Sequence, residues 1–376
     1  MFGALSLSQL QEYWWLIFAI LGALFVFMTF VQGGQTLLHT LGKTEQERDL
    51  LVNSLGRKWE LTFTSIVMFG GALFAAFPKF YAVSFGGAYF VWMGILFTFI
   101  VQAVSYEYRK KASNFFGTRV YEIFMYINGS VGIFLIGVFV GTLFTGGHFY
   151  VNSANLSHWT NSTYGLGAVL NPFNDIFGLM LVFLARVQAN MYFINNVAEE
   201  DILRRAKTSL AYSTVLFVIA FLYVVVSIIA MSGFAVDPQT HVVFIQSHKY
   251  LHNLLDMPVL FAMLLVGALM VLGAIYATLL KGARRGIWFT GIGTILVVMS
   301  LFLTLGYGNT AYYPSLSNLQ SSLTIYNSSS SHYTLTVMSY VSLMVPFVLA
   351  YIFWAWKAMD MDKITIKEIE SDSHHY

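Results

Sequence analysis

The chain has 376 residues, of which 57% are hydrophobic and 10% charged, and its formal net charge is +2. This composition excludes a soluble globular domain, and the lack of cysteine excludes disulfides, thiolate metal sites and iron–sulfur clusters. The basic residues are not interleaved with aromatic residues, so nucleic acid is not an expected partner. We expect an all-α integral membrane protein in the lipid bilayer, because the period-two pattern of a membrane β-barrel is missing.

The hydropathy pattern predicts nine transmembrane helices, each about long enough to cross a bilayer. The first opens with Tyr13, Trp14 and Trp15, which we expect to form an aromatic belt at a membrane surface. Eight spans would permit two four-helix bundles, with one further peripheral helix. In chain order the predicted spans are 14–30, 62–77, 82–105, 122–145, 172–195, 208–231, 258–280, 287–306 and 333–356.

The positive charges alternate between connections, which predicts the orientation. All but three of the 20 basic residues lie in every second connection or in the C-terminal tail. Lys79 and Lys249 lie in the opposite set of connections, and Arg186 lies within a span. Because basic residues near membrane ends stay on the cytoplasmic side, we expect the N-terminus outside and the C-terminus inside. A single polytopic membrane domain would cover 1–357, and 358–376 would form a short cytoplasmic tail.

The histidines indicate whether the bundle itself could bind haem, since axial ligation needs a ligand that faces the bundle interior. All nine His lie in loops, at span ends or in the tail, and none is near the centre of a span. The 16 Met are scattered through the spans and, without His partners, are typical of core packing. We therefore expect no haem and no metal in this chain. Haem ligation by His39 or His252, at the end of a span, stays open as an alternative.

Two carboxylates at the inner ends of spans are candidates for proton transfer, because ionisable residues at membrane depth are costly and often functional. Glu60, at the start of the second span, is either a proton-path entrance or an acid that stabilises a helix N-terminus. Glu122, at the start of the fourth span, has the same structural explanation. Thr62 and Ser65 are three residues apart and share a helical face, so they could carry a water chain from Glu60, whereas Thr64 points elsewhere.

Arg186 is the one basic residue deep within a predicted span. It lies about nine residues from the inner end of the fifth span, on the order of 13 Å along the helix. A lone arginine at that depth must reach the interface or find a partner. We predict an ion pair with Glu60 or Glu122. Gln188 and Asn190 follow it and could line a polar track, although hydrogen bonds between helices are the commoner explanation.

Four stretches, in this order along the chain, resemble subunit II of cytochrome bd-type quinol oxidases. They are Trp59-Glu60 with the segment 70–78, Tyr106-Glu107-Tyr108-Arg109, Leu170-Asn171-Pro172-Phe173, and the segment 322–327 with Thr334-Leu335. Their order and spacing and the nine-span topology agree over nearly the whole chain, so the set is specific where no single motif is.

The resemblance implies a haem-free subunit II of a quinol:oxygen oxidoreductase in a bacterial cytoplasmic (inner) membrane. A larger, haem-bearing subunit I would hold the haems and the site of the membrane quinol. This chain would stabilise that partner and contribute to proton delivery while dioxygen is reduced to water. A bound quinone or lipid and a small third subunit also fit the family pattern.

The sequence also departs from the family, which points to a divergent branch. The family has an Asp-Gly-Phe-Asp-x-Gly motif at the inner end of the first span, where this chain has 30–35 with no acid. The segment 61–65 differs from the family's Asn-x-Val-Trp pattern, and Arg186 stands where the family is apolar. We expect the proton route either to depend on Glu60 or to lie mostly in the partner subunit.

A secondary transporter and a membrane anchor for another enzyme are the alternatives. Transporters often carry matched broken helices in two halves and charges near the midplane. Here the prolines that interrupt spans are not matched between halves, and Arg186 is the only deep charge. No phosphate loop, metalloprotease motif or nucleophile elbow occurs, so we expect no independent catalysis. The candidate proton-path residues are Glu60, Thr62, Ser65, Arg186 and Glu122.

Overall fold

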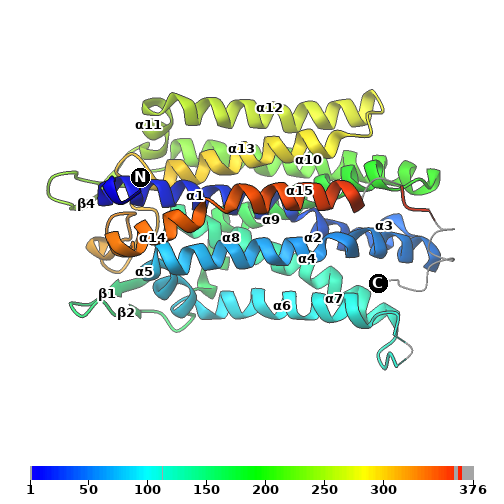
Figure 1. Ribbon diagram of the computed structural model, residues 1–376, viewed down its shortest axis with the longest axis horizontal. Coiled ribbons are helices and arrows are strands. Elements are labelled where there is room, and N and C mark those ends of the chain that lie inside the picture. The colour runs from blue at the N-terminus through cyan, green and yellow to red at the C-terminus, as the bar shows by residue number, and fades with distance from the viewer. Residues whose placement is uncertain (1, 112, 360–362, 366–376) are drawn as a thin grey trace.

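The computed structural model is a bundle of long helices that run along one common axis (Figure 1). It describes residues 2–111, 113–359 and 363–365. Within these residues, nine helical stretches are long and apolar enough to cross a membrane, which confirms the predicted helical class. The stretches are Leu7–Gln35, Glu45–Ala76, Tyr89–Tyr108, Thr118–Thr145, Pro172–Asn196, Glu200–Ala230, Pro258–Leu280, Gly286–Gly306 and His332–Met359.

Some of these stretches contain more than one helical segment, because turns or π-helical segments interrupt them. The elements are α1 (Leu7–Met28), α2 (Phe30–Gln35), α3 (Leu38–Leu41), α4 (Glu45–Ala76), α5 (Pro78–Tyr81), the π-helical η2 (Ala82–Gly86), α6 (Tyr89–Tyr108), α7 (Thr118–Ile127), the π-helical η3 (Asn128–Gly132), α8 (Ile133–Thr145), β1 (Phe149–Val151), β2 (Ser157–Trp159), α9 (Pro172–Asn196), α10 (Glu200–Ala230), β3 (Gly233–Val236), β4 (Val243–Gln246), α11 (Lys249–Asp256), α12 (Pro258–Leu280), α13 (Gly286–Gly306), α14 (His332–Ser342) and α15 (Val345–Met359). Three short 3₁₀ turns, η1 (Phe2–Ala4), η4 (Leu166–Leu170) and η5 (Leu319–Ser321), complete the set.

Local sequence signals explain where three of the long helices begin. Ser6 and Thr44 each form a capping box, in which the hydroxyl accepts from a backbone N–H three residues later. Asn171 caps α9 by accepting from Phe173 N, and Pro172 occupies the first helical position, where its missing N–H is no loss. Side chains therefore satisfy backbone donors that the helix itself leaves free at these ends.

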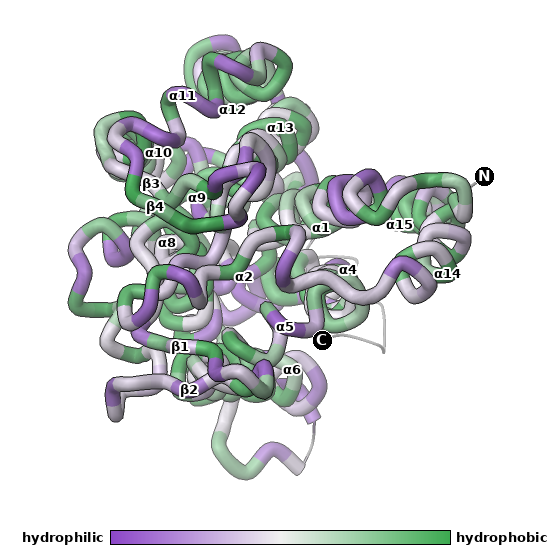
Figure 2. The backbone as a smooth tube through the Cα atoms, turned by 90° about the vertical axis from the view of Figure 1, so that its left-hand side faces the viewer, coloured by the Kyte–Doolittle hydropathy of each residue, from purple (hydrophilic) through white to green (hydrophobic). Residues whose placement is uncertain are grey.

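Helix α9 lies at the centre of the molecule and packs against α2, α8, α10 and α13. Outward from it, α12 packs on α13, and α6 packs on α7. The last span packs on α1 and α4 through α14 and α15. Viewed along the helix axes, α12 and α6 occupy opposite edges, while α14 and α15 project from a third side (Figure 2). The central spans are therefore shielded by protein, and the outer ones expose apolar faces.

The predicted basic connections meet at one end of the bundle. Lys110 Nζ lies 3.2 Å from Glu45 Oε1, and Arg205 forms an ion pair with Glu47. The third and fifth connections therefore both contact the first. A further ion pair, between Arg284 and Glu200, links the connection between α12 and α13 to the start of α10. We call this the basic end; it is defined by Lys43, Arg48, Arg109, Lys110, Arg204, Arg205 and Arg284.

The opposite end, which we call the hairpin end, carries the two β-hairpins and α11 (Figure 1). In the antiparallel pair β1–β2, Phe149 lies opposite Trp159, and in β3–β4 Phe234 lies opposite Ile245. Two long loops, one after α8 and one after α13, pair through backbone hydrogen bonds of 2.9 Å from Gly147 N to Pro314 O and from Leu316 N to Gly147 O. These contacts tie the ends of spans four and eight together.

The predicted aromatic belt of the first span is wrong for Trp14 and Trp15, which are both buried. Trp14 Nε1 donates to Ser339 Oγ at 3.0 Å, and Trp15 Nε1 donates to Phe302 O at 2.8 Å. The indoles face neighbouring spans because α14 and α13 cover this side of α1. A Cβ on Gly306 would overlap the Trp15 ring, so a glycine is required for this close approach.

The predicted tail, 358–376, lies mostly outside the described residues. Helix α15 continues to Met359, two residues beyond the predicted end of the membrane domain. Ile364 forms a parallel bridge beside Val197, with hydrogen bonds of 3.1 Å from Ile364 N to Asn196 O and 3.2 Å from Ala198 N to Ile364 O. This short described part of the tail therefore packs against the end of α9.

Candidate functional site

A cluster of buried charges lies at the basic end, centred on Arg109. Its side chain has no exposed surface, and its Nη2 lies 2.6 Å from Glu122 Oε1 and 2.7 Å from Asp49 Oδ1. The Arg109 Nε also donates to Glu122 Oε1 at 3.2 Å. Glu122 itself is only 3% exposed. We call this group the ion cluster; its members are His39, Arg48, Asp49, Arg109, Lys110 and Glu122.

Four elements deliver these charges. Arg48 comes from the first turns of α4, and its Nε lies 3.4 Å from Glu122 Oε2. His39 of α3 places its Nε2 3.3 Å from the same oxygen, and Lys110 Nζ lies 2.7 Å from Asp49 Oδ2. Burying charge is costly unless it is paired, so every partner here compensates another. The cluster therefore joins the ends of α3, α4, α6 and α7.

The explanation of Glu60 and Glu122 as acids at helix N-termini is wrong. Helix α4 begins at Glu45, so Glu60 lies in its middle. Helix α7 begins at Thr118 and has no acid in its first turn. Hydropathy detects only the apolar part of a helix. Helices α4 and α7 both begin earlier, in polar sequence at the basic end, where residues of the ion cluster pair with one another.

Glu60 and its predicted relay partners lie on opposite faces of α4. Glu60 is exposed, on the same face as Phe63 and Val67. Thr62 and Ser65 share the buried face, as their spacing predicts. Their hydroxyls donate to backbone carbonyls, from Thr62 to Met28 O at 3.2 Å and from Ser65 to Thr62 O at 2.8 Å. The structure therefore does not bring Glu60 together with these two hydroxyls.

The predicted ion pair of Arg186 with Glu60 or Glu122 is wrong. Arg186 Nη1 donates instead to Thr36 Oγ1 at 3.0 Å, and no carboxylate of the described residues lies within ion-pair distance of it. Two physical reasons account for this. Glu122 is already bound by Arg109, and α2 packs between α9, which carries Arg186, and α7, the part of the fourth span that carries Glu122. Among the described residues, a single hydroxyl thus holds the half-buried guanidinium.

A row of buried amides and hydroxyls, which the sequence analysis did not predict as a site, extends from the ion cluster into the bundle. Gln32 Nε2 donates to Gln102 Oε1 at 3.1 Å, and Gln35 Nε2 donates to Tyr106 OH at 3.2 Å. We call this the polar row; its members are Gln32, Gln35, Thr98, Gln102, Tyr106 and Asn128. Tyr106 lies one helical turn before Arg109, so the row and the ion cluster are neighbours on α6.

Several atoms of the polar row have no hydrogen-bond partner among the described residues, namely Gln32 Oε1, Gln35 Oε1, Gln102 Nε2 and Asn128 Oδ1. Buried amide groups of this kind are commonly satisfied by ordered water. A signal was present in the sequence, since Gln32 and Gln35 lie in the stretch 30–35, where the chain departs from the pattern that the resemblance implies. The row therefore leaves four polar atoms without a partner in the described residues, between α2, α6 and η3.

Close helix packing fixes the position of α2. A Cβ on Gly33 would overlap Ala185 O of α9, and one on Gly129 of η3 would overlap Gln32 O. Helix α2 is thus tightly enclosed on both sides, which small residues permit. The π-helical η3 widens its span at this crossing, as π-bulges often do near functional groups.

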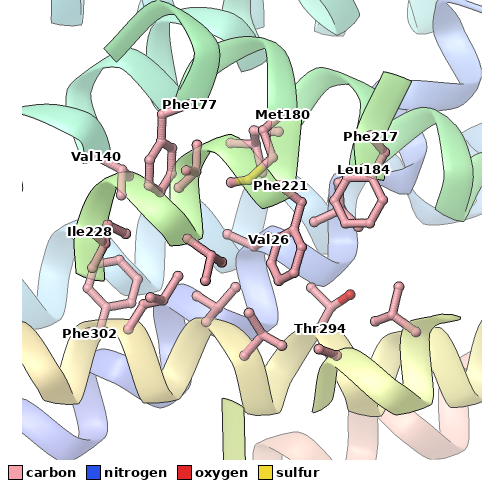
Figure 3. Close-up of a pocket in the computed structure, with 18 of the residues that line it drawn as sticks. Val26, Val140, Phe177, Met180, Leu184, Phe217, Phe221, Ile228, Thr294 and Phe302 are labelled. Carbon is pink, nitrogen blue, oxygen red and sulfur yellow. The ribbon is translucent and has the colours of Figure 1, made fainter. Parts of the chain in front are cut away.

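An apolar cavity of about 70 Å³ lies between α9, α10 and α13 (Figure 3). Phe177, Met180, Phe221 and Phe302 point into it, and Thr294 is its one polar lining residue among those described. The Thr294 hydroxyl already accepts from Gln188 Nε2 at 2.8 Å. The lining therefore fits an isoprenoid or acyl chain and offers little to a polar headgroup.

The described residues contain no group of three His, Asp or Glu placed to hold a metal ion. His39 is occupied with Glu122, and His252 is exposed on α11. Nine candidate spans, a buried ion cluster and a polar row define a polytopic helical membrane subunit whose buried polar groups gather at one end.

The chain belongs to the family of cytochrome bd terminal oxidase subunit II, whose family model matches residues 10–359. It is 28% identical over 378 residues to cytochrome bd-I ubiquinol oxidase subunit 2 of Escherichia coli (strain K12), covering 97% of this chain and 98% of that one. It is 27% identical over 357 residues to cytochrome bd ubiquinol oxidase subunit 2 of Bacillus subtilis (strain 168), covering 93% and 96%. The predicted resemblance is confirmed, and the chain is a subunit of a respiratory oxidase of the cytochrome bd type.

The fold is also similar to a solved one. The structure of bd oxidase from Geobacillus thermodenitrificans contains a chain that matches with a TM-score of 0.62 at 10% identity, covering 94% of this chain and 99% of that one. At that identity the match concerns the fold alone, and it extends over nearly the full length of both chains.

Proposed function

We propose that this chain is the haem-free subunit II of a quinol:oxygen oxidoreductase in a bacterial cytoplasmic membrane. In this role it stabilises a haem-bearing subunit I, which binds the membrane quinol, and contributes to proton delivery as dioxygen is reduced to water. The observation that carries the proposal is the full-length family match, with relatives named subunit 2 of ubiquinol oxidases. The alternatives, a secondary transporter or an anchor of another enzyme, have no comparable support.

The orientation follows from the charges. The basic end faces the cytoplasm, so the N-terminus is outside and the C-terminus inside, in accord with the retention of basic loops. The first four spans form one four-helix bundle and spans five to eight a second, with the ninth as a peripheral helix. Within the groups α6 packs on α7 and α12 packs on α13, and the two bundles would meet where α9 packs on α2 and α8 and where α1 packs on α13. Residues 1–357 then form one membrane domain.

The exposed face of α4 is the surface that we assign to the contact with subunit I. It carries Glu60 together with Phe63, Val67 and Phe74, all of which are exposed. A carboxylate among apolar side chains on a membrane helix is unfavourable in lipid and is usually paired. A protein partner can supply hydrogen bonds to Glu60 and apolar contacts to the rings, whereas lipid tails supply only the second.

Proton delivery would use two separate groups. Glu60 is the proton-accepting residue on the partner face, in the middle of α4, and the ion cluster with the polar row offers a polar route from Glu122 at the basic end into the bundle. Thr62 holds α4 against α1, because its hydroxyl donates to Met28 O. The Ser65 hydroxyl is engaged within α4 by Thr62 O. Arg186 contributes positive charge beside the route, across α2 from the polar row.

The apolar cavity near Thr294 is the place that we assign to a bound quinone or lipid tail. Its lining suits a prenyl or acyl chain, which gains van der Waals contacts with the apolar side chains. A small third subunit would have to bind on an outer span, where apolar side chains are exposed, as on α12.

The test of the proton role is Glu60→Gln in the assembled oxidase, reconstituted in liposomes. We expect normal assembly and a loss of at least tenfold in oxygen consumption, because a positioned proton-transferring group contributes on this order or more. The matched control is Glu107→Gln, an exposed carboxamide substitution at the end of α6. Full proton-coupled activity in Glu60→Gln, with normal assembly, would contradict the assignment of Glu60.

A further inference from the structure

A second cavity, of about 520 Å³, opens at the basic end between α3, α9 and α10. We call it the basic cavity. Four cationic side chains line it: Lys43, Arg186, Arg204 and Arg205. No Asp or Glu belongs to its lining among the described residues. The cavity therefore presents an excess of positive charge where a membrane span meets the basic end.

Two of these four cations keep their charge uncompensated. Arg204 Nη2 lies 2.8 Å from Asp201 Oδ1, and Arg205 pairs with Glu47 outside the cavity. Arg186 donates only to the Thr36 hydroxyl, and Lys43 Nζ donates to His39 O at 3.1 Å. Neither Arg186 nor Lys43 has a carboxylate within ion-pair distance in the described part of the chain. The cavity lining therefore carries positive charge that no carboxylate of the described residues neutralises.

Hydroxyls complete the polar lining. Ser209 and Ser213 lie one turn apart on α10, and both are buried residues that line the cavity. Neither hydroxyl has a hydrogen-bond partner within the described residues. Tyr212, between them, is exposed and lines the same wall. A wall of hydroxyl and guanidinium donors with no carboxylate acceptor matches the oxygen atoms of a phosphate.

The cavity continues into an apolar surface. Phe183 and Leu216 belong to its lining, and Ile219, one turn further along α10, is exposed. A free anion would use only the polar part, whereas an amphiphile would use both parts. Basic pockets between transmembrane helices on the cytoplasmic side are typical binding sites for anionic lipid headgroups.

We propose that the basic cavity binds one anionic phospholipid of the cytoplasmic leaflet. Its phosphate lies between Arg186, Lys43 and Arg205, within reach of the Ser209 and Ser213 hydroxyls. Its acyl chain follows Phe183 and Leu216 along α10. The assignment of the leaflet rests on the proposed orientation. The lipid site itself does not depend on oxidase activity, so its failure and that of the proposed function are distinguishable.

The test measures lipid binding to the delipidated two-subunit complex by native mass spectrometry. Dioleoyl-phosphatidylglycerol and dioleoyl-phosphatidylcholine are titrated separately, and the dissociation constant of the first bound lipid is compared. We expect phosphatidylglycerol to bind several-fold more tightly. Arg186→Gln should weaken that binding about fivefold, the value of one basic residue near an anionic lipid. Arg186→Lys, which keeps the charge, should retain most of it.

Matched variants separate the cavity from general surface charge. Arg119→Gln removes an exposed cation at the same end of the bundle, outside the cavity, and should leave the dissociation constant unchanged. Ser209→Ala with Ser213→Ala keeps every charge and should weaken phosphatidylglycerol binding by a smaller factor. Equal constants in the wild type and Arg186→Gln, or an equal loss in Arg119→Gln, would overturn the proposal. Displacement of the lipid by an equal concentration of orthophosphate would assign the cavity to a free anion instead.

Discussion

Arg109 and Arg186 lie at the same end of one helical bundle, yet they are stabilised in different ways. Arg109 is fully buried and bound by both Glu122 and Asp49. Arg186 is half-buried and bound by one hydroxyl, that of Thr36. Helix α2 lies between the two environments and is tightly packed on both sides.

The difference shows two ways in which a membrane protein can accommodate a deep charge. A charge removed from solvent on all sides needs an opposite charge within the chain. A charge that borders an open cavity can be compensated from outside, by lipid headgroups or by a partner. The first arrangement contributes to the stability of the chain itself, and the second provides a binding site.

The largest effect is expected from breaking the internal pair. Glu122→Gln leaves Arg109 buried with one carboxylate fewer, and we expect a loss of about 3–5 kcal/mol in the free energy of unfolding. Lys110→Gln is the control, since Lys110 is half-exposed and an exposed pair contributes about 1 kcal/mol or less. Thermal unfolding of the purified complex at one detergent concentration measures both. A similar small loss in both variants would remove the distinction between the two arginines.

The second-largest effect is expected from a substitution in α2, the helix that lies between Arg109 and Arg186. Gly33→Ala places a methyl group against Ala185 O, and overpacking of this kind costs about 1–3 kcal/mol. Gly273→Ala on α12 is the control, because no atom lies within 4 Å of the added Cβ, and alanine favours the helix. We expect a lower unfolding temperature for the first variant and an equal or higher one for the second. Equal unfolding temperatures for both would mean that α2 can shift away from α9.

A smaller loss is expected at the second arginine. Arg186→Leu removes one hydrogen bond, which is worth about 1 kcal/mol, and restores an apolar residue inside a span. The complex should therefore assemble normally and unfold within a few degrees of the wild type. A loss as large as that of Glu122→Gln would show that Arg186 has a strong internal partner, and the comparison between the arginines would fail.

The smallest effect concerns the Tyr307 hydroxyl at the hairpin end, whose pKa is shifted by burial without any ion pair. Burial, with the nearby Glu12, raises the pKa of Tyr307 to about 12 from its ordinary value of 10.0. The folded state thus keeps a proton that the unfolded state releases, so stability is full below pH 10 and falls as the pH rises towards 12. Unfolding temperatures at pH 9 and pH 11 should differ more for the wild type than for Tyr307→Phe. Identical slopes would contradict this origin.

The sequence predicts the parts of the fold that depend on hydropathy and charge. Nine spans and the convergence of the basic connections follow from these patterns, because lipid selects apolar helices and leaves basic loops at one end. Helix beginnings were less predictable, since α4 starts in polar sequence well before its apolar part. The burial of Trp15 could not be predicted either, because a pattern along one helix does not reveal which neighbour covers it.

The candidate site was predicted only in part. The shared face of Thr62 and Ser65 follows from helical periodicity and is confirmed. Arg109 was expected among ordinary loop cations, although its side chain is fully buried. Some pairs join residues that are distant in the sequence, such as Arg109 with Asp49 and Gln32 with Gln102. These pairs depend on how the helices cross, which a single sequence does not predict.

The central claim is that this chain functions as the haem-free partner of a haem-bearing oxidase subunit. A mild-detergent pull-down of the chain from its native membrane, followed by a reduced-minus-oxidised optical spectrum and a quinol oxidase assay, tests it most directly. We expect a larger co-purified subunit with haem absorption and quinol-dependent oxygen consumption. A colourless chain that stays folded without any partner would contradict it.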